Sequence, residues 1–119
     1  ATKMLLYETL VGMTNMGASG VSNVVGPRSA GGRLTNYLSP LEHQFGGEVY
    51  KASAGITREH ANEIARRFIP KYEDQLRERP DGMSFTECYD VGKLKPIPEW
   101  QRMYDEVREE AIQAGLNLG

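Results

Sequence analysis

The chain has 119 residues, the commonest size of a single domain, and its composition of 39% hydrophobic and 25% charged residues is that of an ordinary globular protein. The formal net charge of −2 argues against a nucleic-acid-binding surface, and no apolar run approaches the roughly 20 residues that a membrane span needs. The single cysteine, Cys88, cannot form an internal disulfide, which favours a reducing compartment with the cytoplasm as the default. Ala1 stands where an initiator Met is expected, which suggests a processed or excised start.

The amino-terminal part is predicted to be one apolar helix followed by a glycine-rich passage. Thr2 is a suitable cap for a helix from Lys3 to Met16, and its apolar stripe is wide enough to be buried on more than one side. After it, Val21 to Val25 is a possible short strand within a run of Gly, Ser and Ala. Most glycines precede Thr57 and charged residues concentrate after it, so we divide the chain into residues 1–40, which hold the leading helix and the glycine-rich passage, and 41–119, which hold amphipathic helices.

Two helices are predicted in the middle of the chain. Ser39 as cap and Pro40 at the first position open one that runs to about Ser53, and its Gly46-Gly47 pair indicates close helix packing. Thr57 caps the clearer one, which extends to about Arg79 with a kink at Pro70.

The last third, Ser84 to Leu118, has well-formed helix signals. Ser84 and Glu87 form a capping box for a short turn that Gly92 is expected to end, and Pro98 opens the terminal helix. One apolar stripe and a closing glycine complete the helix, and two leucines after it are placed to fold back: Trp100, Met103, Tyr104, Val107, Ala111, Gly115, Leu116 and Leu118. The pattern is typical of a docked terminal helix, and a helix that fits a partner's groove is the alternative.

Candidate chemistry is sparse. The run from Gly26 to Arg33 combines a flexible glycine-rich backbone, whose N–H groups could bind an anion, with two arginines. It is therefore either an anion cradle or an ordinary packed turn, and it matches neither phosphate-loop nor dinucleotide motifs. His43 and His60 lie on different predicted helices without ligand-spaced companions, so we expect no metal site. Cys88 has no local histidine, and we expect it to be a buried structural thiol.

Acidic pairs offer no clearer site. Glu42 with Glu48, or Glu59 with Glu63, are possible carboxylate pairs, but helices rich in acidic residues provide such pairs by chance. The nucleophile motif G-x-S-x-G is absent from the sequence. The residues alone therefore describe a mainly α chain with no catalytic signature.

Several blocks resemble one known family. They are Glu48 to Ile56 (EVYKASAGI), the helix ending near Tyr72-Glu73, Phe85 to Val91 (FTECYDV), Pro98 to Asp105 (PEWQRMYD) and the ending at Gly115-Leu116. These blocks resemble the carboxyl-terminal end of monomethylamine methyltransferases, closely from about Leu41 to Leu118 and more loosely from Met4 to Tyr37.

The resemblance implies an α/β TIM-barrel enzyme of which this chain is roughly the last quarter, with the final barrel elements and terminal helices. It implies methyl transfer from monomethylamine to the cobalt of a corrinoid carried by a partner protein, through an upstream pyrrolysine that no residue here can replace. No catalytic residue and no directly bound cofactor are thus expected in this chain, and its expected partners are the corrinoid protein, the rest of the barrel and further copies of itself. Gly17 to Arg33 is the region expected to border a substrate or partner surface.

Three hypotheses follow from these observations. The chain is part of a methylamine:corrinoid methyltransferase, a free-standing helical interaction module, or a small anion-binding protein that uses Gly26 to Arg33. Under the first hypothesis, the isolated chain is expected to expose the apolar faces of Met4 to Met13 and of Trp100 to Ala111.

Overall fold

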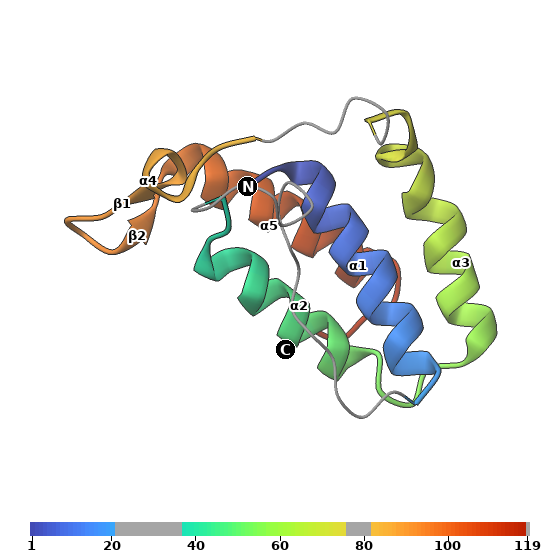
Figure 1. The fold of residues 1–119 in the computed structure, drawn as a ribbon. Helices are drawn as coiled ribbons and strands as arrows, with labels where there is room; N and C mark the ends of the chain where they lie inside the picture. The colour runs from blue at the N-terminus through green and yellow to red at the C-terminus, as the bar shows by residue number, and fades with distance from the viewer. Residues whose placement is uncertain (21–36, 76–81, 119) are drawn as a thin grey trace.

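A long apolar helix, α1 (Lys3–Ala18), is the element against which the other helices pack (Figure 1). The computed structural model describes residues 1–20, 37–75 and 82–118. Within them, α2 (Pro40–Ala52), α3 (Arg58–Phe68) and α5 (Pro98–Gln113) each contact α1. The expectation of a mainly α chain is confirmed for the described residues.

The sequence of α1 explains its central place. Thr2 caps the helix by accepting a hydrogen bond from the backbone N–H of Leu5, as predicted. Its buried residues are spread around the helix rather than along one face: Leu5, Leu6, Tyr7, Thr9, Leu10, Val11, Met13 and Thr14. The helix is therefore enclosed on more than one side, which confirms the expectation drawn from its wide stripe.

The helix α2 begins and ends where the sequence predicts, with Ser39 as its N-cap and Ser53 as its C-cap. The expectation that both glycines allow close packing is wrong for one of them. Gly46 is buried, but Gly47 is exposed and a Cβ there would meet no atom within 4 Å. Close approach occurs instead at Gly17 of α1, where a Cβ would lie 1.7 Å from the Ser53 hydroxyl oxygen.

The helix α3 is shorter than predicted. It starts after the Thr57 cap but ends at Phe68, and two short 3-10 turns follow, η2 (Ile69–Lys71) and η3 (Glu73–Gln75). The physical reason is Pro70, which lacks the N–H that the next α-helical hydrogen bond requires, so the chain continues in tighter 3-10 turns. The predicted continuation over residues 76–79 lies outside the described residues.

The capping box at Ser84 and Glu87 starts a single turn, α4 (Phe85–Cys88). The expectation that Gly92 ends this turn is wrong. Tyr89 is already extended and begins an antiparallel hairpin, β1 (Tyr89–Asp90) and β2 (Lys95–Pro96), in which Tyr89 pairs with Pro96 and Asp90 with Lys95. Gly92 lies in the turn between the strands, and the left-handed residue is Leu94, with φ 55°.

The terminal helix α5 follows the predicted pattern. Pro98 occupies its first position, Trp100, Tyr104, Val107 and Ala111 are buried, and Met103 is half-buried. Gly115 ends it with φ 100°, and the N–H of Leu116 returns to the carbonyl of Ala111 at 3.2 Å. Leu116 and Leu118 then fold back into the core, as expected.

The expected exposed faces of α1 and α5 are absent from the described structure, so that expectation is wrong. The stripe of α5 is buried and the residues of α1 are enclosed, because the helices bury these surfaces on one another within a single core. The large hydrophobic residues that stay exposed among the described ones are few: Ile69, Val91, Leu94 and Ile112.

Candidate functional site

The most deeply buried polar cluster lies where α2 begins beside α5. Glu42 and Ser39 are fully or almost fully buried, and one Glu42 carboxylate oxygen accepts hydrogen bonds from the backbone N–H and the hydroxyl of Ser39, each at 2.5 Å. The same hydroxyl accepts a hydrogen bond from the indole N–H of Trp100 at 2.9 Å. Ser39 thus connects a helix cap to a core tryptophan, and the hydrogen bonds that its hydroxyl donates and accepts stabilise the fold.

The second carboxylate oxygen of Glu42 has no hydrogen-bond partner among the described residues, and the nitrogen of Ala1 lies 3.9 Å from it. Cys88 is fully buried nearby, and burial together with the negative charge of Glu42 raises the pKa of its thiol. A buried thiol in its neutral form is a poor nucleophile, and the expectation that Cys88 is buried is confirmed.

A second, half-buried network joins α2, α5 and the terminal residues. Glu48 accepts hydrogen bonds from the hydroxyl of Tyr104 at 2.5 Å and from the side chains of Gln44 at 2.9 Å and Arg108 at 3.0 Å. Arg108 also donates to the carbonyl of Leu118 at 2.9 Å. Burial alone would raise the pKa of Glu48, but these hydrogen bonds and the Arg108 charge outweigh it and lower that pKa.

A third contact ties α1 to α5 and η2. The Tyr7 hydroxyl donates to Glu110 at 2.9 Å, the Lys71 ammonium pairs with the same carboxylate, and Lys71 lies 5.4 Å from the centre of the Tyr7 ring. Burial and the hydrogen bond to the Glu110 carboxylate raise the pKa of Tyr7. In all three clusters the polar side chains bond partners from other elements, apart from the one Glu42 oxygen without a hydrogen bond, so their role is in packing.

The remaining candidates from the sequence do not converge. His43 is exposed on α2, whereas a ring nitrogen of His60 lies 2.8 Å from the carbonyl oxygen of Ala114. The carboxylates of Glu42 and Glu48 belong to the two separate networks above, and Glu59 and Glu63 are exposed on α3. No group of three or more His, Cys, Asp or Glu residues in the described ranges could hold a metal ion. The candidate anion cradle, Gly26 to Arg33, and the possible strand Val21 to Val25 lie outside the described residues.

The sequence contained a signal for the buried cluster. Ser39 and Glu42 have the same S-x-x-E spacing as Ser84 and Glu87, so a second capping box was predictable. Its burial against Trp100 was not predictable, because only the packing of α5 beside α2 places the indole there.

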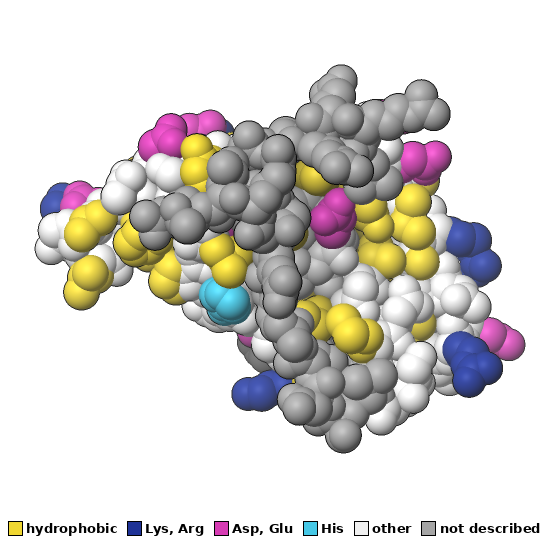
Figure 2. Space-filling view, viewed as in Figure 1, with side chains coloured by type: hydrophobic (Ala, Val, Ile, Leu, Met, Phe, Trp, Pro, Cys, Tyr) yellow, Lys and Arg dark blue, Asp and Glu magenta, His cyan; other side chains and the backbone are white. Residues whose placement is uncertain are grey.

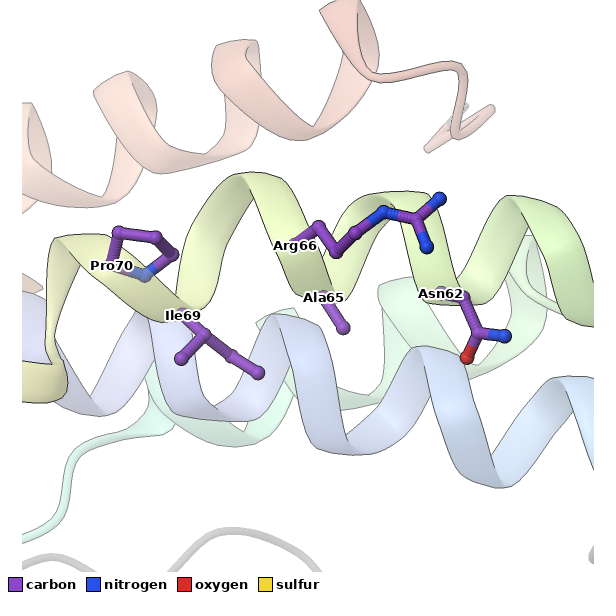
Figure 3. A pocket seen from close by; sticks show the side chains of 5 residues that line it. All are labelled: Asn62, Ala65, Arg66, Ile69 and Pro70. Carbon is purple, nitrogen blue, oxygen red and sulfur yellow. The ribbon is translucent and has the colours of Figure 1, made fainter.

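One hollow of about 390 Å³ follows a face of α3 and its continuation. Its described lining comes from one stretch of chain: Asn62, Ala65, Arg66, Ile69 and Pro70 (Figure 3). Figure 3 shows Asn62, Ala65 and Ile69 pointing to the same side of that stretch. Among the described residues, the lining offers one guanidinium, that of Arg66, and no nucleophile or acid-base pair. No helix in the described part of the chain is long and apolar enough to cross a membrane.

Comparison with known proteins identifies the family. The family profile described as monomethylamine methyltransferase MtmB matches residues 1–116. MtmB of Methanosarcina mazei and MtmB1 of Methanosarcina acetivorans are each 33% identical over 115 residues, which is 97% of this chain and 25% of theirs. The crystal structure of MtmB from Methanosarcina barkeri superposes with a TM-score of 0.88 at 33% identity and covers 98% of this chain and 25% of that one.

These matches place the chain among relatives of methyltransferases. More narrowly, the chain belongs to the monomethylamine methyltransferase MtmB family. It spans about a quarter of the length of the curated relatives it matches, each of which is 25% covered. The family resemblance read from the sequence is thereby confirmed.

Proposed function

We propose that this chain is the carboxyl-terminal quarter of a methyltransferase that moves the methyl group of monomethylamine to the cobalt of a corrinoid protein. The observation that carries the proposal is the match of 98% of the chain to one quarter of the solved relative, at a TM-score of 0.88. Similarity at 33% identity over nearly the whole chain is what a retained role in that enzyme would produce.

In this proposal, the chain supports the reaction and does not perform it. Its buried Glu42 belongs to a helix cap and its thiol is buried in the core, while Glu48 joins α2 to α5 and Glu110 joins α5 to α1 and η2. The reacting groups, including a pyrrolysine, belong to the barrel upstream. This segment is a preformed helical unit that braces the barrel, and it binds no corrinoid itself.

The test uses the full-length gene product with the purified corrinoid protein in its reduced Co(I) form. Monomethylamine is expected to produce methyl-cobalt absorbance, whereas dimethylamine and trimethylamine are expected to give at most a small fraction of that rate. No methyl transfer from monomethylamine under these conditions would reject the proposal.

The second hypothesis is a helical interaction module without catalysis. The closed core favours this second hypothesis, because the segment buries its apolar faces without a barrel. Intact mass of the natural protein separates the two, because the module predicts a protein near the 13.3 kDa of this chain and the enzyme predicts one about four times larger, from the 25% coverage of the relatives.

A further inference from the structure

The chain enters α1 through residues that are enclosed and hydrogen-bonded. Ala1 is 1% exposed, and Thr2 already caps the helix through the N–H of Leu5. Boundaries between the units of a protein normally fall in exposed, flexible linkers that few contacts cross. The entry into α1 has the opposite character, because contacts from distant parts of the chain converge on it.

Ala1 and Met83 exchange two backbone hydrogen bonds. The nitrogen of Ala1 donates to the carbonyl of Met83 at 2.8 Å, and the N–H of Met83 donates to the carbonyl of Ala1 at 3.0 Å. This reciprocal pattern is that of two facing residues in an antiparallel ladder. It uses one N–H and one carbonyl of Ala1, which a residue inside a longer chain also has, so the pairing does not require a free amino group.

Gly82 allows the two segments to approach this closely. A Cβ at Gly82 would lie 2.2 Å from the methyl carbon of Thr2 and 2.3 Å from the carbonyl oxygen of Ala1. The φ of Gly82 is +74°, in the left-handed region that favours glycine. Any other residue here would collide with the backbone of the entry and strain its own.

The contacts around the entry are anchored in the core. Met83 packs against the hydrophobic core cluster, and Glu42, at the buried start of α2, has a carboxylate oxygen 3.9 Å from the nitrogen of Ala1. The carbonyl of Tyr37 lies 2.8 Å from the same nitrogen. The entry is therefore held from the start of α2 and from the chain before α4, which fixes its direction relative to the whole helical unit.

We propose that an entry clamp, formed by Gly82, Met83 and Glu42 around Ala1 and Thr2, joins this helical unit rigidly to the part of the protein that precedes it. The family profile matches from residue 1, and the chain covers 25% of each relative, so the clamp lies where further chain would enter. The inference rests on the proposed function for the existence of that preceding part. A clamped entry lets the unit and the preceding part move as one body, as a brace requires.

The first test is hydrogen exchange of the full-length protein, measured by mass spectrometry without methylamine or corrinoid protein. The amide of Met83 is expected to exchange at least about tenfold more slowly than in an unstructured peptide. Gly82→Ala is expected to remove this protection and to leave peptides of α3 at their wild-type rates. The matched control is Gly55→Ala, because Gly55 has a similar φ of +83° but a Cβ there would meet no atom within 4 Å. It adds the same kind of backbone strain without the collision, and is expected to leave Met83 protected.

The second test measures rigidity by time-resolved fluorescence anisotropy of a dye on Glu63→Cys in the full-length protein. Glu63 is exposed on α3, which forms an edge of the molecule away from the entry (Figure 1), where Figure 2 shows charged side chains. With a rigid joint, the dye follows only the slow rotation of the whole protein. Gly82→Ala is expected to add a rotation about four times faster, because this unit has about a quarter of the mass, from the 25% coverage of the relatives. Gly55→Ala is expected to add none.

Three results would overturn the rigid joint. They are exchange of the wild-type Met83 amide at the rate of an unstructured peptide, equal effects of Gly82→Ala and Gly55→Ala, and a fast rotation in the wild-type protein. The two wild-type measurements decide the matter even if Gly82→Ala fails to fold. Neither test involves turnover, so an inactive protein with a protected, rigid entry rejects only the proposed function, and an active enzyme with a freely rotating unit rejects only the clamp.

Discussion

Ser39 holds the buried start of α2 against α5 through one hydroxyl that bonds both Glu42 and Trp100. Replacing Ser39 with Ala leaves the indole N–H and the carboxylate buried with one partner fewer each. We expect Ser39→Ala to lower the free energy of unfolding by about 2–4 kcal/mol. Urea denaturation followed by the fluorescence of Trp100, the only tryptophan, measures this loss.

The matched control is Ser84→Ala in the second capping box, which is half-buried and bonds no core side chain among the described contacts. Its expected cost is about 1 kcal/mol or less. Equal costs for the two substitutions would show that the link to Trp100 adds nothing to a simple helix cap.

Substituting alanine for each of two glycines of α1 is expected to change the stability of the protein in opposite directions. A Cβ at Gly17 would lie 2.7 Å from the Cβ of Ser53 and still closer to its hydroxyl, whereas a Cβ at Gly12 would meet no atom within 4 Å. We expect Gly17→Ala to destabilise the protein by about 1–3 kcal/mol through overpacking. Gly12→Ala should stabilise it by about 0.5–1 kcal/mol through helix propensity, and thermal denaturation of both variants checks the sign.

At the scale of elements, α2 and α5 are joined by the Glu48 network, which makes their packing sensitive to acid. The lowered pKa of Glu48 means that the folded state favours the ionised carboxylate, so its contribution is present above the unfolded-state pKa and is lost as pH falls through the lowered folded-state value. We expect Glu48→Gln to reduce stability at pH 7 and to flatten the loss of stability below about pH 4.3, the ordinary value for Glu.

The control for this experiment is Glu63→Gln, an exposed residue of α3. Its unfolding free energy is expected to follow the wild-type pH dependence. If Glu48→Gln and the wild-type protein lose stability in parallel from pH 5 to pH 2.5, the network does not carry the assigned linkage.

Helix starts were predictable because they depend on short local patterns. The predicted helix starts agree with the structure within one residue at Thr2, Ser39, Thr57 and Pro98. The predicted helix end at Gly115 also agrees with it. Two errors arose where local signals compete. Pro70 ended α3 although the apolar stripe continues past it, and a hairpin replaced the glycine-terminated turn expected at Gly92 because the pairing of Tyr89 with Pro96 was invisible in the sequence pattern.

The candidate site was less predictable than the fold. Cys88 was correctly expected to be buried, since nothing near it in sequence activates a thiol. The convergence of Ser39, Glu42 and Trp100, and that of Glu48, Tyr104 and Arg108, depend on how α2 and α5 pack beside each other. These contacts join residues about 60 positions apart in the chain, so no local sequence pattern indicates them.

At the scale of the whole molecule, the helices close a core that includes residues from both ends of the chain. Leu6 and Leu10 belong to the same cluster as Phe45, Trp100 and Leu116. We therefore expect residues 1–119, expressed alone, to fold as a helical monomer with a single cooperative urea transition and little binding of a hydrophobic dye. Broad unfolding with strong dye binding would mean that the core depends on the rest of a longer protein.

We propose that this segment belongs to a monomethylamine methyltransferase and braces it without supplying reacting groups. The most direct measurement splits the full-length protein before this segment and assays methyl transfer from monomethylamine to the corrinoid protein with each piece alone and with both mixed. We expect neither piece to be active alone, and we expect mixing the folded segment with the upstream piece to restore turnover. Full activity of the upstream piece alone, or any activity of the segment alone, would contradict it.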